Sequence, residues 1–446
     1  MAEDRYSHSA AELSAIAAQV LDYARAAGAT ACETEVSIGF GQTVTARLGD
    51  VETIEYTRDK GLGVTVYVGR QRGHAGTSDF SADALKQTAE AAVAIARHTA
   101  ADDCAGLADR ELLAVDPPDL DLHHPWDLPV ERAIELAKEA EAAAMAVDPR
   151  INNSDGATVS VHESRFVYAN SLGFSGGYPT SRHSVSCAVI GGEGDAMQRD
   201  YWYSSGRVPG ELEQAAAVGR RAGERTAQRL GARKIATAEV PVVFEAPVAA
   251  SLIGHFVHAV SGGSLYRKAS FLVDSLGKAV FSEAVTLRER PHLPRALASA
   301  PFDDEGVATR ERDVVTAGTL NGYFLGSYSA RKLKMRTTAN AGGNHNLLLE
   351  PGPLDLPGLL REMGTGLLVT ELLGHGVNTV TGDYSRGAAG FWVESGAIAY
   401  PVQEITIAGN LADMFKRIVA VGSDVVARGS KRCGSILIER MTIAGD

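Results

Sequence analysis

Polar and apolar side chains alternate along much of the segment EVSIGFGQTVTARLGDVETIEY, residues 35–56. The same period of two returns at residues 64–68. Alternation of this kind is typical of a β-strand that buries one of its faces. The runs are interrupted by Gly39, Gly41, Gly49 and Gly61. We therefore predict several short strands, joined at these glycines into an antiparallel meander.

Helical patterns flank this meander. The first covers residues 9–28, where Ser9 and Glu12 form a capping box and Gly28 provides a stop. Further along the chain we expect helices at residues 81–99, 130–146 and 210–230, and strand-like hairpins at residues 157–169, 181–190 and 198–205. Residues 100–129 are acidic and carry four prolines, which indicates a surface connector.

The second half of the chain differs in character from the first. It is rich in glycine and in short β-like runs, with helices expected at residues 247–260 and 357–365. The fold class that we predict is α+β. A mixed α/β domain would cover residues 1–235, and a mainly antiparallel β domain would cover residues 236–446.

Composition excludes several classes of protein. The 446 residues include 43 Lys and Arg against 55 Asp and Glu, a formal charge of −12, which disfavours binding to nucleic acid. The most apolar stretch, residues 240–260, is interrupted by polar residues and does not predict a membrane span. Residues 1–15 lack the pattern of a signal peptide, and four scattered cysteines do not suggest a disulfide framework, so we expect a cytoplasmic protein.

The zinc-peptidase pattern H-E-x-x-H is absent, but one pair of histidines has metal-ligand spacing. His255 and His258 stand three residues apart on the predicted helix 247–260, so their side chains share one face. Cys433 is a candidate third ligand. In the alternative interpretation, both histidines are hydrogen-bonded residues of a half-buried helix.

Other motifs match known chemistry only in part. The run 370–375, TELLGH, has threonine where a metallopeptidase helix would carry its first histidine. The run 173–177, GFSGG, matches G-x-S-x-G but is followed by another strand-like segment instead of a helix. A basic cluster precedes the glycine-rich run 341–346 and comprises Arg331, Lys332, Lys334 and Arg336. The glycine-rich turn beside these residues could bind an anion through backbone N–H groups. In the alternative interpretation, the basic cluster belongs to a solvated face.

Three segments of the second half resemble the PmbA/TldD family. They are residues 320–345, residues 381–394 and the run YPVQEITIAGNL at 400–411. The resemblance extends over essentially the whole chain and is closer to the PmbA branch, also called TldE, than to the TldD branch. It implies a heteromeric cytoplasmic metalloprotease that degrades or matures unfolded peptides.

The resemblance also implies how the work is divided between two subunits. In the TldD branch, the ligands are the two histidines of H-E-x-x-x-H and a cysteine near the C-terminus. The corresponding positions here are Gly254, His255, Ala259 and Cys433, so only the cysteine is kept. We therefore expect this chain to be the non-metal half, with zinc or a similar divalent metal in a TldD-like sister subunit.

Three functions remain open on this basis. As a partner subunit, the chain would help to form a β-lined chamber that grips unfolded peptides by strand addition. As a stand-alone metallopeptidase, it would use a non-standard site at His255, His258 and Cys433. As a non-enzymatic regulator, it would bind peptides without cleaving them. Where a sister subunit is absent, we expect a homodimer.

Overall fold

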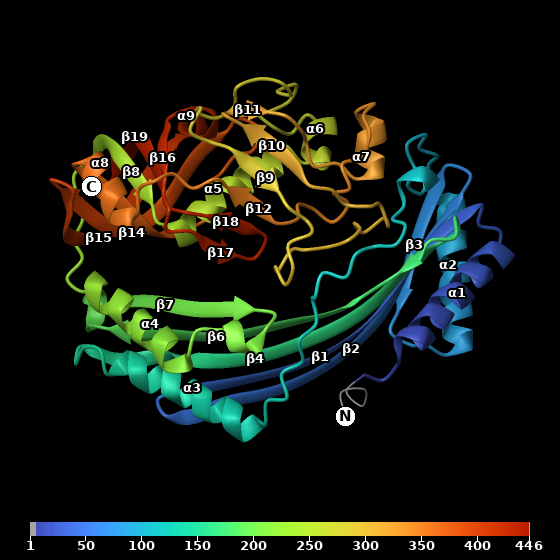
Figure 1. The fold of residues 1–446 in the computed structure, drawn as a ribbon, viewed down its shortest axis with the longest axis horizontal. Coiled ribbons are helices and arrows are strands. Elements are labelled where there is room, and N and C mark those ends of the chain that lie inside the picture. The colour runs from blue at the N-terminus through green and yellow to red at the C-terminus, as the bar shows by residue number, and fades with distance from the viewer. Residues whose placement is uncertain (1–5, 446) are drawn as a thin grey trace.

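A long, curved antiparallel sheet dominates the N-terminal part of the computed structural model, which describes residues 6–445 (Figure 1). The strand order is β3-β2-β1-β4-β6-β7, with β5 paired to β4. The strands are β1 (Ala31–Arg47), β2 (Asp50–Val68), β3 (Gln71–Thr77), β4 (Ile151–Asn170), β5 (Ser175–Gly176), β6 (Pro179–Gly191) and β7 (Gln198–Gly206).

Two pairs of helices cover the convex face of this sheet. At one end, α1 (Ala10–Ala26) and α2 (Ala82–His98) share a core with β1 and β2. At the other end, α3 (Val130–Met145) and α4 (Ala215–Arg229) pack on β4 and β6. The predicted capping box is present, because the Ser9 side chain accepts from the backbone N–H of Glu12 and the Glu12 carboxylate accepts from that of Ser9.

The predicted breaks at Gly39, Gly41 and Gly61 are wrong. Strands β1 and β2 run through these glycines without interruption. At Gly41 the missing side chain relieves crowding between the strands, since a Cβ there would lie 2.4 Å from Oγ1 of Thr57. Only Gly49 forms a turn: together with Leu48 it has positive φ, as a two-residue hairpin requires.

The start of one helix also departs from the predicted pattern. The helix expected at residues 210–230 begins only at Ala215, because residues 212–214 lie against β7 and Trp202 donates a hydrogen bond to Glu213. Residues 100–129 contain a single short element, the 3-10 helix η2 (Arg110–Leu112). The four cysteines are all free thiols.

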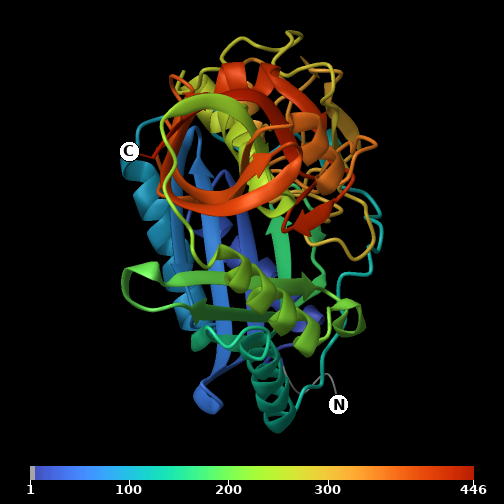
Figure 2. The same ribbon diagram turned by 90° about the vertical axis from the view of Figure 1, so that its left-hand side faces the viewer.

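The C-terminal part is built from two sheets and lies over the concave side of the N-terminal sheet (Figure 1). In the first sheet, β15 pairs with both β14 and β19, so that β15, β14, β13, β8 and β19 close into a ring (Figure 2). The members of this sheet are β8 (Ala238–Phe244), β13 (Gly366–Leu373), β14 (Asp383–Glu394), β15 (Ala397–Asn410), β16 (Ile418–Val421) and β19 (Ile436–Ala444).

The second sheet has the order β11-β10-β9-β12-β18-β17. Its strands are β9 (Leu287–Glu289), β10 (Arg312–Thr316), β11 (Thr319–Leu320), β12 (Leu347–Leu349), β17 (Val426–Arg428) and β18 (Lys431–Cys433). The helices of this part are α5 (Ala246–Ala259), α6 (Gly262–Tyr266), α7 (Ser327–Lys332), α8 (Leu356–Met363) and α9 (Leu411–Lys416).

One core joins α5 to both C-terminal sheets. Phe256 of α5, Leu287 of β9 and Ile407 of β15 all belong to it. The mixture of helices with largely antiparallel sheets confirms the α+β class. No helix within residues 6–445 is both long and apolar enough to cross a membrane.

Candidate functional site

Helix α5 carries both histidines that the sequence singled out. His258 is exposed, whereas His255 is half-buried and packs edge-on against the ring of Tyr384, with 6.0 Å between ring centroids. The Nε2 atom of His255 is buried and has no hydrogen-bond partner among residues 6–445. Burial lowers the pKa of His255, and the positive charges of Arg386 and His258 lower it further, which favours the neutral imidazole.

Cys433 lies at the opposite end of the same helix. Its thiol contacts the carbonyl oxygen of Ala246, at 3.7 Å, in the first turn of α5. His255 follows nine residues later, about 13 Å along the helix axis. Burial raises the pKa of the Cys433 thiol to about 12, so the metal-binding thiolate is disfavoured.

These residues do not fit a bound metal. No three His, Cys, Asp or Glu side chains within residues 6–445 are placed so that they could hold an ion. The surroundings are also cationic: Lys431 reaches over α5, and its Cε would lie 3.6 Å from a Cβ at Gly254.

The partial motifs have structural roles. Residues 370–373 belong to strand β13, and Ser175 with Gly176 forms the short strand β5. In the basic cluster, Arg331 donates to the carbonyl oxygens of Cys104, Gly106 and Leu107. Lys332 pairs with Asp102 at 2.9 Å. These two cations therefore hold the connector instead of binding a free anion.

A cavity of about 910 Å³ lies between the concave face of the N-terminal sheet and loops of the C-terminal part. We call it the interdomain cleft. Its floor consists of small and polar residues from β1, β2 and β3, and four carboxylates line it: Glu33, Glu35, Asp304 and Glu305. Burial raises the pKa of Glu33, Glu35 and Asp304.

Glu33 is the most embedded of these acids. Its carboxylate accepts hydrogen bonds from the hydroxyls of Tyr67, at 3.1 Å, and Tyr168, at 2.7 Å. The two tyrosines stand on β2 and β4, on either side of β1, so the register of three strands fixes the position of Glu33. Composition and motif spacing gave no sign of this arrangement, because its members are far apart in the chain.

Aromatic rings line the adjoining cavity. The rings of Phe166 and Tyr178, both from the N-terminal part, pack edge-on with 4.7 Å between centroids. Phe302, from the C-terminal part, packs edge-on against Tyr178 at 5.6 Å. All three line the cavity that also reaches Glu35 and Asp304. The cleft therefore offers an apolar wall beside an acidic one.

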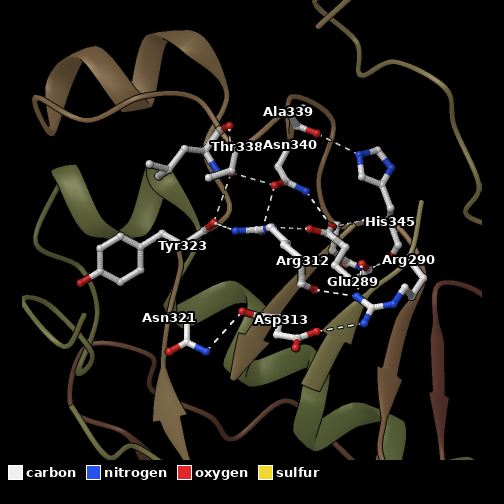
Figure 3. Close-up of polar contacts among 12 residues, drawn as sticks. Glu289, Arg290, Arg312, Asp313, Asn321, Tyr323, Thr338, Ala339, Asn340 and His345 are labelled. Atoms are coloured by element: carbon white, nitrogen blue, oxygen red, sulfur yellow. Dashed lines mark hydrogen bonds and ion pairs between the residues drawn. The ribbon is translucent and has the colours of Figure 1, made fainter. Parts of the chain in front are cut away.

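A buried polar network positions the glycine-rich loop of the cleft (Figure 3). One oxygen of the Glu289 carboxylate accepts from Nδ2 of Asn340 and from the backbone N–H of His345, both at 2.8 Å. The other accepts from Nε of Arg312 at 2.7 Å. Nε2 of His345 lies 2.9 Å from the carbonyl oxygen of Ala339. These bonds span residues 339–345, where Ala341 lines the interdomain cleft and the two glycines line the adjoining aromatic cavity.

The glycine-rich run is thus part of the site, but an acid stands beside it. Gly342 has a φ of +88°, which favours glycine, and a Cβ there would lie 2.2 Å from Oδ2 of Asp304. An anion at this loop would meet that carboxylate. The lining is instead suited to polar or cationic groups and to a polypeptide backbone, because carboxylates, hydroxyls and bare glycine backbone face the same space.

Comparison with known proteins matches the chain along most of its length. Three domain models of the PmbA/TldA metallopeptidases match: domain 1 at residues 32–96, the central domain at 123–230 and the C-terminal domain at 237–445. The "Metalloprotease PmbA homolog" of Haemophilus influenzae is 51% identical over 96% of this chain and 94% of its own length.

Two more distant proteins are also similar. The "Metalloprotease TldD homolog" of the same Haemophilus influenzae strain is 23% identical over 81% of this chain and 79% of its own length. The crystal structure of a candidate modulator of DNA gyrase from Bacteroides thetaiotaomicron superposes with a TM-score of 0.93. It is 29% identical and covers 98% of this chain and 99% of its own.

Proposed function

This chain belongs to the PmbA/TldD family of metallopeptidases, and on that premise we propose that it is the non-metal subunit of a cytoplasmic peptide hydrolase. The observation that supports this role most directly is the separation of His255 and Cys433 along α5, with Lys431 over the helix between them. Zinc or a similar metal, and the water that it activates, would belong to a TldD-like sister subunit.

The pairing of two related chains has support of its own. Haemophilus influenzae has one protein named as a PmbA homolog and another named as a TldD homolog, and this chain is similar to both. It is more than twice as similar to the first. Two subunits of one fold would form a chamber with a catalytic half and a supporting half.

The interdomain cleft is where this chain would hold its share of an unfolded peptide. Arg72, His74 and Gly76 of β3 line the cleft, and β3 is the last strand on its side of the sheet. An extended peptide can pair with such an edge through its backbone, which makes binding insensitive to sequence. The acidic residues Glu35 and Asp304 would favour peptides that carry positive charge.

The test compares the full chain alone with the chain co-expressed with the TldD-like protein of its own organism. We expect metal and hydrolysis of a labelled unstructured peptide only in the co-expressed complex, measured by elemental analysis with native mass spectrometry and by cleavage. A variant of this chain carrying His255→Ala and His258→Ala should leave both unchanged. N-methylation of alternate peptide backbone nitrogens should weaken binding strongly.

Two results would favour the other functions. Stoichiometric metal in the isolated chain, lost in the double histidine variant, would identify a stand-alone peptidase. Peptide binding without cleavage in every combination of subunits would identify a regulator that binds peptides in the cleft.

A further inference from the structure

A second cavity, of about 270 Å³, is lined by residues from both parts of the chain. We call it the α5 pocket. Strand β7 and helix α4 contribute one wall, and α5, β13, β14 and β17 contribute the rest. Its lining includes Trp202, Ser251, Thr370, Arg386 and Arg428. None of these residues has a part in the proposed peptidase role.

Two guanidinium groups in this lining lack a carboxylate partner among residues 6–445. The Nε of Arg386 makes only a long contact, 3.5 Å, with the carbonyl oxygen of Leu373. Arg428 stacks on the rings of Trp202 and Tyr203, and its Nη1 reaches the Tyr203 carbonyl oxygen at 3.4 Å. The Nε of Arg428 is buried and has no hydrogen-bond partner in the part of the chain that the structure describes.

Three acids lie in or beside the pocket, and two other arginines pair with them. Arg225 binds Glu245 at 2.7 Å and Asp200 at 3.2 Å. Arg229 binds Glu371 at 2.5 Å. Together with Arg386 and Arg428, four guanidinium groups therefore face three carboxylates. One positive charge is in excess, and a single anion would complete the local charge balance.

Thr370 gives an independent sign of a ligand. It sits at the bulge between Val369 and Glu371 in the pairing of β13 with β14. The residue is 8% exposed, lines the pocket, and its Oγ1 is buried without a hydrogen-bond partner. A buried hydroxyl is normally hydrogen-bonded, so an unpartnered one that lines a cavity marks a place for an acceptor.

We propose that the α5 pocket binds the carboxylate at the C-terminal end of a peptide. Arg386 and Arg428 supply charge and planar donors that match a carboxylate, and Thr370 supplies a hydroxyl donor. The small volume admits the end of a chain and excludes a folded surface. The inference is independent of the subunit role, because it concerns binding by this chain alone.

The test is calorimetric titration of the full chain with three probes. These are acetyl-tetra-alanine with a free C-terminal carboxylate, the same peptide as its C-terminal amide, and sodium phosphate. We expect the free acid to bind at least tenfold more tightly than the amide and than phosphate. Arg386→Gln should weaken binding of the free acid at least tenfold, and Thr370→Val, which keeps the side-chain shape, should weaken it severalfold.

Arg132→Gln is the matched control, because Arg132 is an exposed arginine on α3, outside the pocket, and its loss should change nothing. Arg428→Lys keeps the charge and gives a second variant if Arg386→Gln does not fold; it should weaken binding because the planar donors are lost. Equal binding of acid and amide, tighter binding of phosphate, unchanged binding by the variants, or no binding at millimolar peptide would each overturn the proposal.

Discussion

The carboxylate of Glu289 and the guanidinium of Arg312 lie 2.7 Å apart, with only 1% of the Glu289 side chain exposed. The pair does not stand alone, since Asn340 contacts both partners: its Nδ2 donates to Glu289 and its Oδ1 accepts from Arg312. A buried ion pair adds little unless its remaining donors and acceptors are satisfied, and here they are. The network therefore fixes the loop that closes one side of the interdomain cleft.

Removal of the negative charge from this network should be costly. We expect Glu289→Gln to lower the free energy of unfolding by about 3 kcal/mol, because Arg312 is left without its buried counter-charge. Urea denaturation measures the change. Arg25→Gln, which breaks an exposed pair with Asp22, should change it by less than about 1 kcal/mol. Equal effects of the two substitutions would show that the network does not contribute as proposed.

Arg331 should hold the connector in place. Arg331→Met keeps the aliphatic stem but loses the hydrogen bonds to Cys104, Gly106 and Leu107. We expect faster hydrogen exchange and protease cleavage in residues 102–109, with a loss of about 1–3 kcal/mol in the stability of that segment. Arg336→Met, at an exposed position of the same basic cluster, is the control and should leave both rates unchanged.

The elements that the sequence predicted correctly depend on local signals. Helix α1 follows from the Ser9 and Glu12 capping box and from its apolar period, and the structure places it within two residues of the prediction. The role of Gly41 could not be predicted in the same way. A glycine in a turn and a glycine that makes room for Thr57 on the next strand look alike in one sequence.

Less of the candidate site could be predicted from the sequence, because its geometry depends on contacts between residues that lie far apart in the chain. Spacing correctly placed His255 and His258 on one helix, but the position of Cys433 depends on how β18 packs against α5. The carboxylate of Glu33 is held in place by Tyr67 and Tyr168, which lie 34 and 135 residues away along the chain. Such contacts leave no periodic trace in the chain.

Asp303 should make stability depend on pH near neutrality. Burial, assisted by the charge of Glu305, raises the pKa of Asp303 to about 7, despite hydrogen bonds from three backbone N–H groups. Between pH 4 and 7 the folded state holds a proton that the unfolded state has released. The free energy of unfolding should therefore contain a contribution that is full below pH 4 and lost by pH 7 and above.

The Asp303→Asn variant isolates this contribution. Each tenfold difference in proton affinity corresponds to about 1.4 kcal/mol. At each pH the measured quantity is the unfolding free energy of the parent protein minus that of the variant. We expect this quantity to fall by more than about 1.4 kcal/mol between pH 4 and pH 7. Chemical denaturation at a series of pH values measures it. Parallel curves for the two proteins would mean that Asp303 ionises at its ordinary pH in the folded state.

Two helical glycines should respond in opposite directions to the same substitution. A Cβ at Gly219 of α4 would lie 1.8 Å from the backbone oxygen of Ala140 on α3, so Gly219→Ala must push the two helices apart. We expect a loss of about 1–3 kcal/mol or more in the free energy of unfolding.

At Gly254 of α5, the nearest atom is Cε of Lys431, at an ordinary contact distance of 3.6 Å. Gly254→Ala should therefore stabilise the protein by about 0.5–1 kcal/mol, because alanine loses less backbone entropy in a helix. Thermal and urea unfolding of both variants test the pair, and a destabilising Gly254→Ala would show that the space above α5 is tighter than the contact of Lys431 indicates.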